Sequence, residues 1–213
     1  MDDKESSAFR LVTMSRRGLS SVSRIMGRIA GWIFILCAFY ITADVLLRNL
    51  VGVSSQAAIE LTGYMLACGT AWALGYALIE RCHIRIDLLV DKLPARARYV
   101  LHAASLGALA VFVGFLAKGA IDLVEESWLF GATDISILRT PLVIPQGLWA
   151  FGICVFFLLI VSMLVESVLL IARGKGALVE QRLRSRSYDE EAAEALQAVG
   201  ADVSETQNAK TLP

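Results

Sequence analysis

Four long apolar runs constrain this chain more than any other feature. They comprise residues 29–51, 57–79, 99–117 and 143–172 of the 213-residue sequence. Each approaches or exceeds the roughly 20 residues that a helix needs to cross a hydrocarbon layer about 30 Å thick. A soluble helical core would show a polar face recurring every 3.6 residues, and these runs show none. The sequence therefore predicts an all-α integral membrane protein with four transmembrane helices, the third extending to about residue 124.

The basic residues are distributed unevenly among the segments that connect these runs. Lys and Arg total 20, and 17 of them lie on one side of the predicted membrane. The basic segments are residues 1–28, 80–98 and 173–213. The opposite side holds only Arg48, Lys118 and Arg139. Because cytoplasmic segments carry the excess of positive charge, we expect both termini to be cytoplasmic.

Three regions follow from this topology. We expect a basic cytoplasmic N-terminal segment (1–28), a four-helix membrane domain (29–172) and a charged, partly disordered cytoplasmic tail (173–213). The first apolar run is longer than the roughly 7–15 residues of a signal peptide, so it should remain as a membrane anchor. Topology accounts for the basic segments without nucleic acid.

Catalytic and metal-binding patterns are not evident in the sequence. The four cysteines are scattered, without a Cys-x-x-Cys pair, which argues against a disulfide or metal site. We find no nucleophile–base pair and no phosphate-binding loop. The sequence therefore predicts a protein that is not an enzyme and that needs no cofactor.

Several ionisable residues lie in or beside the apolar runs, where insertion costs roughly 2.5–3.5 kcal/mol each. The predicted topology places five of them near the outer boundary: Asp44, Arg48, Glu60, Lys118 and Asp122. The first two and the last two have i,i+4 spacing and can pair on one helix face. We expect their role to be charge anchoring or pairing, with contact with a partner and coordination of an ion or substrate as the alternatives. Glu166 lies near the cytoplasmic end of the last run, where we expect anchoring at the lipid headgroups.

The second run carries a small residue at every fourth position. These residues are Gly63, Ala67, Ala71 and Gly75. Such a face allows another helix to approach closely and gain van der Waals contacts. The face can serve packing among the four helices or contact with a second protein, and the sequence leaves both open.

Four motifs, in this order, resemble the small permease subunit (DctQ-like) of tripartite ATP-independent periplasmic (TRAP) transporters. They are Asp44-Val-Leu-Leu-Arg48-Asn, Glu60-Leu-Thr-Gly-Tyr64, Glu80-Arg-Cys-His83-Ile-Arg85-Ile-Asp87-Leu-Leu, and Leu138-Arg139-Thr-Pro141-Leu-Val-Ile-Pro145-Gln-Gly-Leu-Trp149. The resemblance covers about residues 25–172. The candidate partner-interface or structural residues are Asp44, Arg48, Glu60, Gly63, Ala67, Ala71, Gly75, His83, Arg85, Asp87, Arg139, Pro141, Pro145 and Trp149.

The resemblance implies a function that composition alone does not show. A TRAP small subunit lies in the bacterial inner membrane beside a large permease subunit, which holds the substrate and sodium sites. A periplasmic solute-binding protein delivers an organic anion to this pair. The chain would then act as a scaffold without substrate, metal or cofactor sites of its own. The alternatives are a small self-sufficient proton-coupled exporter, with Glu60 or Asp44 as proton carrier, and a membrane-anchored assembly or regulatory protein.

Overall fold

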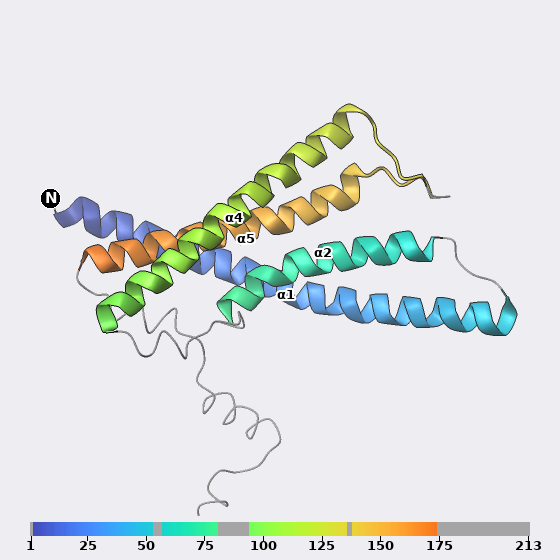
Figure 1. Cartoon of the computed structure of the whole chain (residues 1–213), viewed down its shortest axis with the longest axis horizontal. Coiled ribbons are helices and arrows are strands. Elements are labelled where there is room, and N and C mark those ends of the chain that lie inside the picture. Colours follow the sequence, from blue (N-terminus) through green and yellow to red (C-terminus); the bar gives the residue numbers. More distant parts are fainter. Residues whose placement is uncertain (1, 53–56, 81–93, 136–137, 174–213) are drawn as a thin grey trace, which may run out of the picture.

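The computed structural model describes residues 2–52, 57–80, 94–135 and 138–173, with side chains from residue 12 onward except at 95 and 96. These residues form four helices, shown in Figure 1: α1 (Asp2–Val51), α2 (Ala58–Ile79), α4 (Ala95–Leu129) and α5 (Val143–Ala172). An isolated β-bridge joins Thr133 to Pro141. The predicted sites at His83, Arg85 and Asp87 and the predicted tail lie outside the described residues.

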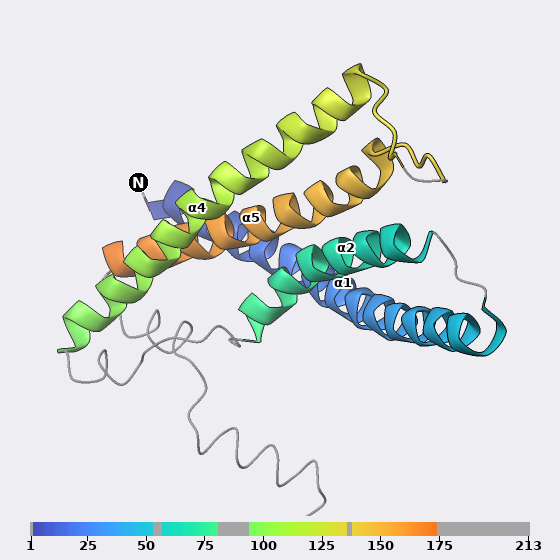
Figure 2. The ribbon, with the colours of Figure 1, turned by 45° about the vertical axis from the view of Figure 1, so that its right-hand side comes forward.

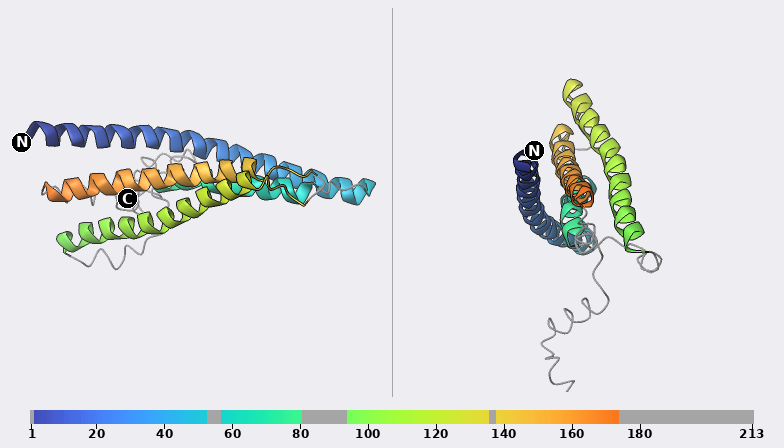
Figure 3. Two further views of the ribbon diagram at one scale, coloured as in Figure 1. Left: turned by 90° about the horizontal axis from the view of Figure 1, so that it is seen from above. Right: turned by 90° about the vertical axis from the view of Figure 1, so that its left-hand side faces the viewer.

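The helices form two hairpins that share α5 as their common neighbour. α1 packs along α2, α4 packs along α5, and α5 also contacts both α1 and α2. Figures 2 and 3 show α1 and α4 on opposite sides of the pair formed by α2 and α5. The α4–α5 hairpin therefore keeps one flank that α1 and α2 do not cover.

Three helices in the described part of the chain are long and apolar enough to cross a membrane. They are the segments Val12–Val51, Ala97–Leu129 and Val143–Ala172. α2 has 22 residues, which is sufficient length, but its glycines, threonines and tyrosines lower its hydropathy below that of a membrane-spanning segment. Of the four predicted spanning helices, three are thus confirmed as long and apolar enough. Whether α2 spans the membrane depends on how it packs against the others.

α1 is much longer than the expected helix at 29–51, because it begins at Asp2. The part of α1 from Arg16 to Gly27 packs against the other helices. A Cβ atom added to Gly75 of α2 would lie 2.8 Å from Oγ of Ser23, and one added to Gly27 would lie 2.5 Å from Cβ of Tyr76. The close approach of backbones at these two glycines holds the N-terminal half of α1 against α2.

The core lies where α2, α4 and α5 meet. Its buried residues are Ala71, Leu78, Leu106, Ala110, Val113, Ala117, Ile153, Phe156, Leu159, Ile160 and Leu170. By contrast, the outward faces of α1 and α4 expose many large apolar side chains, including Phe39 and Phe115. An apolar exterior around an apolar core is the pattern of a protein surrounded by lipid.

Candidate functional site

The N-terminal end of α2 carries a cluster of polar side chains, and we call it the outer end because the predicted topology places it on the outer side of the membrane. The hydroxyl of Tyr64 lies 2.6 Å from Oδ2 of Asp134 and 3.0 Å from Oε1 of Glu60. Glu60 is one helical turn before Tyr64, whereas Asp134 lies in the connection between α4 and α5. A phenol has one proton to donate, and its hydrogen bond to a carboxylate is charge-assisted. Tyr64 therefore ties the α4–α5 connection to α2.

The α4–α5 connection is itself a small hairpin. The amide of Asp134 donates to the carbonyl of Thr140, and the amide of Leu142 donates to the carbonyl of Ala132, each at 3.0 Å. α4 ends where Gly131 adopts φ +58, a left-handed conformation that glycine tolerates without strain. Arg139 also has a positive φ, of 43, which is uncommon for a residue with a side chain. The hairpin therefore presents exposed Arg139 in a constrained backbone conformation.

A hollow of about 280 Å³ lies beside this cluster and brings three predicted site residues together. Ala67, Pro145 and Trp149 all line it, although the sequence separates the first from the others by more than 70 positions. The full lining is Tyr64, Ala67, Leu123, Leu142, Pro145, Gln146 and Trp149. Side chains from α2, α4 and α5 thus converge at the outer end of the molecule.

Two hydrogen bonds fix α2 against the first turns of α5. Nε1 of Trp72 donates to the carbonyl of Leu148 at 2.8 Å, and the thiol of Cys68 approaches the carbonyl of Pro145 at 3.7 Å. Side chains four residues apart on one helix lie on the same face. This face of α2 is therefore committed to α5 and is closed to a second protein.

The predicted small-residue face of α2 divides into two halves. Ala71 is 2% exposed, and both it and Gly75 are buried against other helices of the chain. Gly63 and Ala67, nearer the outer end, are exposed. The inner half therefore serves internal packing, and only the outer half is available to a partner.

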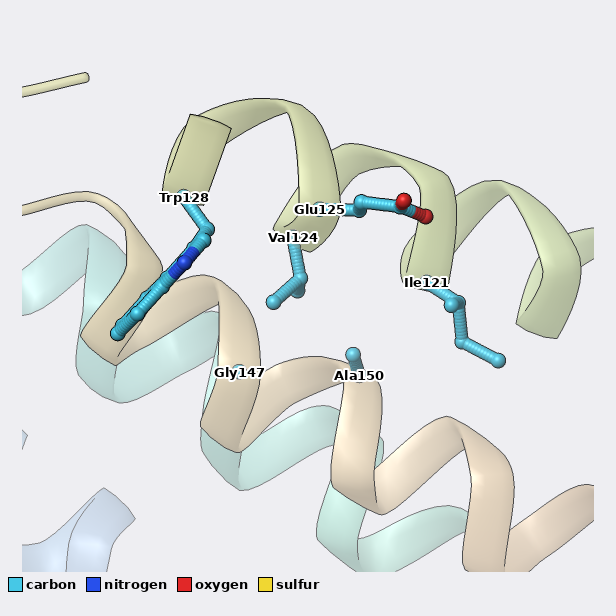
Figure 4. Close-up of a pocket in the computed structure, with 6 residues that line it drawn as sticks. All are labelled: Ile121, Val124, Glu125, Trp128, Gly147 and Ala150. Atoms are coloured by element: carbon cyan, nitrogen blue, oxygen red, sulfur yellow. The ribbon is translucent and has the colours of Figure 1, made fainter. Parts of the chain in front are cut away.

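A second hollow of about 350 Å³ lies between the outer ends of α4 and α5, as Figure 4 shows. Val124 points from α4 towards α5, and the indole of Trp128 lies alongside the first turns of α5. Gly147 and Ala150 form the facing wall, and the space exists because the first has no side chain and the second has only a methyl group. The lining is apolar except for Glu125.

The remaining predicted residues occupy different surroundings. Asp44 is half-buried and Arg48 is exposed near the outer end of α1, and Pro141 is exposed at the start of the α5 turn. Their predicted role in partner contact stays a prediction. The predicted spacing of Lys118 and Asp122 does yield an ion pair, with 2.6 Å between Nζ and Oδ2.

Glu166 is not a simple headgroup anchor, as the sequence had suggested. Its side chain is 5% exposed, and Oε2 lies 2.6 Å from Nε of Arg16. Burial of a carboxylate is costly unless a cation compensates it. The N-terminal half of α1 supplies that cation, and the sequence gives no local signal for a pair 150 positions apart.

These features define a polytopic helical membrane protein whose polar groups join its helices near their ends. The family model for the DctQ component of tripartite ATP-independent periplasmic transporters matches residues 37–170, more than half of the chain. The chain therefore belongs to the DctQ family, which confirms the resemblance seen in its motifs. Members of this family are membrane components of transporters, and the family is not an enzyme family.

Other comparisons add little. The chain is similar to choline transporter-like protein 3 of Homo sapiens, with 26% identity over 97 residues. That alignment covers 46% of this chain and 14% of the human protein, so the chain spans only a small part of that relative. No solved structure matches the chain.

Proposed function

We propose that the chain is the small membrane subunit of a sodium-coupled, binding-protein-dependent secondary transporter for organic acids. It lies in the bacterial inner membrane and acts as a scaffold for a large permease subunit. The family match across residues 37–170 is the observation that carries this proposal. Substrate and sodium sites belong to the large subunit, and a periplasmic solute-binding protein delivers the substrate.

The packing of α2 supports a topology with four spanning helices and both termini in the cytoplasm. α2 runs back along α1 and contributes Ala71 and Leu78 to the apolar core. A helix packed between α1 and α5 contacts less lipid, so it needs less hydropathy to span. The 17-to-3 distribution of basic residues supports the cytoplasmic placement of both ends.

The scaffold role is supported by how the chain uses its charges. Glu166 is compensated by Arg16, Glu60 is bonded to Tyr64, and Lys118 is paired with Asp122. Each of these contacts joins residues within the chain. A coupling site instead uses polar groups or unwound backbone near the centre of the membrane to hold an ion or substrate.

Transport in reconstituted vesicles tests the proposal. The chain alone should move neither an organic acid nor sodium, whereas the chain with its large subunit and binding protein should support uptake driven by a sodium gradient. A matched measurement with potassium in place of sodium controls for leakage. Glu60→Gln should weaken assembly or docking more than it alters sodium dependence. Gradient-driven transport by the chain alone would refute the scaffold role and favour a proton-coupled exporter.

A further inference from the structure

A groove on the flank of the α4–α5 hairpin is larger than the two hollows at the outer end of the molecule. Its volume is about 480 Å³, and all of its lining comes from α4 and α5. The lining residues are Gly107, Ala110, Val111, Gly114, Phe115, Lys118, Phe157, Val161 and Leu164. The groove is open at Gly107, Ala110 and Gly114 because these residues are small, and the larger side chains form its walls. From Gly107 to Lys118 the groove extends about 16 Å, or three helical turns.

The outer end of this groove carries an exposed ion pair. The side chains of Lys118 and Asp122 are 73% and 58% exposed. They lie within the segment Ala97–Leu129, which is apolar and long enough to span a membrane. Charged groups exposed to hydrocarbon are costly, and those in spanning segments usually face a polar partner or water.

The register of the hairpin fixes the residues of α5 that lie level with this pair. A Cβ added to Gly114 would lie 3.1 Å from Phe157, and one added to Gly107 would lie 4.0 Å from Leu164. In this antiparallel register Lys118 is level with about residue 153 and Asp122 with about residue 149. The exposed side chains of Leu148 and Phe151 therefore lie at the depth of the ion pair.

At this depth α4 exposes a charged pair and α5 exposes apolar side chains, and a lipid layer cannot be favourable for both. If the hydrocarbon begins below Lys118, then Leu148 and Phe151, about 50% exposed, face water. If it begins at the start of α5, the ion pair lies about 10–15 Å inside the hydrocarbon. A protein surface can place a polar group over the pair and apolar side chains over its neighbours. A single protein partner that contacts both the groove and the ion pair satisfies both requirements.

We propose that this groove and the adjacent Lys118–Asp122 pair receive a transmembrane helix of the large permease subunit. That helix presents apolar side chains along the groove and a polar or charged group against the ion pair. This inference rests on the proposed function, because it names the surface through which the two subunits meet. It places the large subunit on the flank of α4, opposite α1 (Figure 3).

Site-specific photo-crosslinking in membranes that contain the whole transporter tests the contact directly. A photoreactive residue at Val111 or Phe115, on the groove wall, should give an adduct with the large subunit. The same residue at Trp32 or Phe39 on α1, which are equally exposed, should not. Adducts from the α1 positions alone would overturn the inference, as would groove adducts formed only with lipid or with a second copy of this chain.

Matched substitutions give an independent readout. Gly107→Leu should fill the groove, because a Cβ there meets only Leu164 at 4.0 Å. Gly31→Leu on α1, outside the proposed interface, is the control, since a Cβ there meets nothing within 4 Å. The large subunit recovered per copy of this chain should fall about tenfold for Gly107→Leu and remain unchanged for the control. Equal recovery for both variants would overturn the inference.

Replacing both charges tests the role of the ion pair. Lys118→Met combined with Asp122→Leu should leave the amount of this chain in the membrane unchanged or higher and reduce recovery of the large subunit. Unchanged recovery would show that the pair meets no polar group of the large subunit. If the unmodified chain recovers no large permease at all, the proposed function fails, and that outcome is distinct from failure of the groove alone.

Discussion

The buried pair of Arg16 and Glu166 offers a direct test of how the N-terminal half of α1 is held. Arg16→Met keeps an apolar stem of similar length and removes the charge. Glu166 then remains as a carboxylate that is 5% exposed and has lost the guanidinium 2.6 Å from its Oε2. Breaking a buried pair by removal of one member typically costs about 3–5 kcal/mol.

The structure sets the expected cost near the lower end of that range. The side chain of Arg16 is 29% exposed, so solvent screens part of the interaction. We expect a loss of about 3 kcal/mol, which is a change of roughly 100-fold in the unfolding equilibrium. Arg17→Met is the matched control, because Arg17 is exposed and should cost less than about 0.5 kcal/mol.

Unfolding of the detergent-solubilised chain, followed by tryptophan fluorescence, measures both variants. Arg16→Met combined with Glu166→Leu should recover most of the loss, because no uncompensated charge remains in the interior. The reasoning is refuted if Arg16→Met unfolds like the Arg17→Met control. It is also refuted if the double variant is no more stable than Arg16→Met alone.

Two further predictions concern the outer half of the molecule. Tyr64→Phe removes the hydroxyl that ties the connection between α4 and α5 to α2. Hydrogen exchange of the backbone amides in that connection should therefore become roughly tenfold faster, whereas Tyr76→Phe should leave it unchanged. Gly152→Ala should destabilise the chain by about 1–3 kcal/mol, because its Cβ would lie 2.6 Å from Cδ1 of Trp72. Gly147→Ala meets nothing within 4 Å and should stabilise α5 by up to about 1 kcal/mol, so equal unfolding midpoints for the two glycine variants would contradict the packing.

Apolar length was a reliable guide to the helices themselves. The run at 143–172 coincides with α5, Val143–Ala172, because it is almost continuously apolar and its one proline, Pro145, lies in the first turn, where a helix tolerates it. The N-terminal extension of α1 was less predictable. Residues 12–28 are too polar to be recognised as part of a membrane-spanning run. Their helix is held by contacts of Arg16, Ser23 and Gly27 with residues that are distant in the sequence.

The polar contacts show where sequence reasoning stops. Lys118 and Asp122 are one turn apart, so their spacing alone predicts the pair. Tyr64 stands one turn from Glu60 and could have been paired with it, but its partner Asp134 is 70 positions away. Long-range partners depend on how the two hairpins dock, which apolar periodicity does not specify.

The α2 face illustrates the same limit for packing. Gly63, Ala67, Ala71 and Gly75 form one continuous stripe in the sequence, yet α1 and α5 bury only its inner half. A control for substitutions on this face should be a residue that makes no internal contact. Leu66, which is 48% exposed, meets this condition better than Leu74, which packs against the core. The stripe predicts close helix contact, but the crossing point of the helices decides which of its members make that contact.

The arrangement of charge along the α4–α5 hairpin links these observations to function. In the register set by Gly114 and Phe157, the levels of Lys118 and Glu166 are about 13 residues, or about 20 Å, apart. That separation is smaller than a hydrocarbon layer about 30 Å thick, so at least one pair lies within the layer. Glu166 is enclosed and compensated, whereas Lys118 and Asp122 face outward beside an open groove. Between them the core is apolar, so the charged pair that is exposed lies on the exterior wall, where a second subunit can reach it.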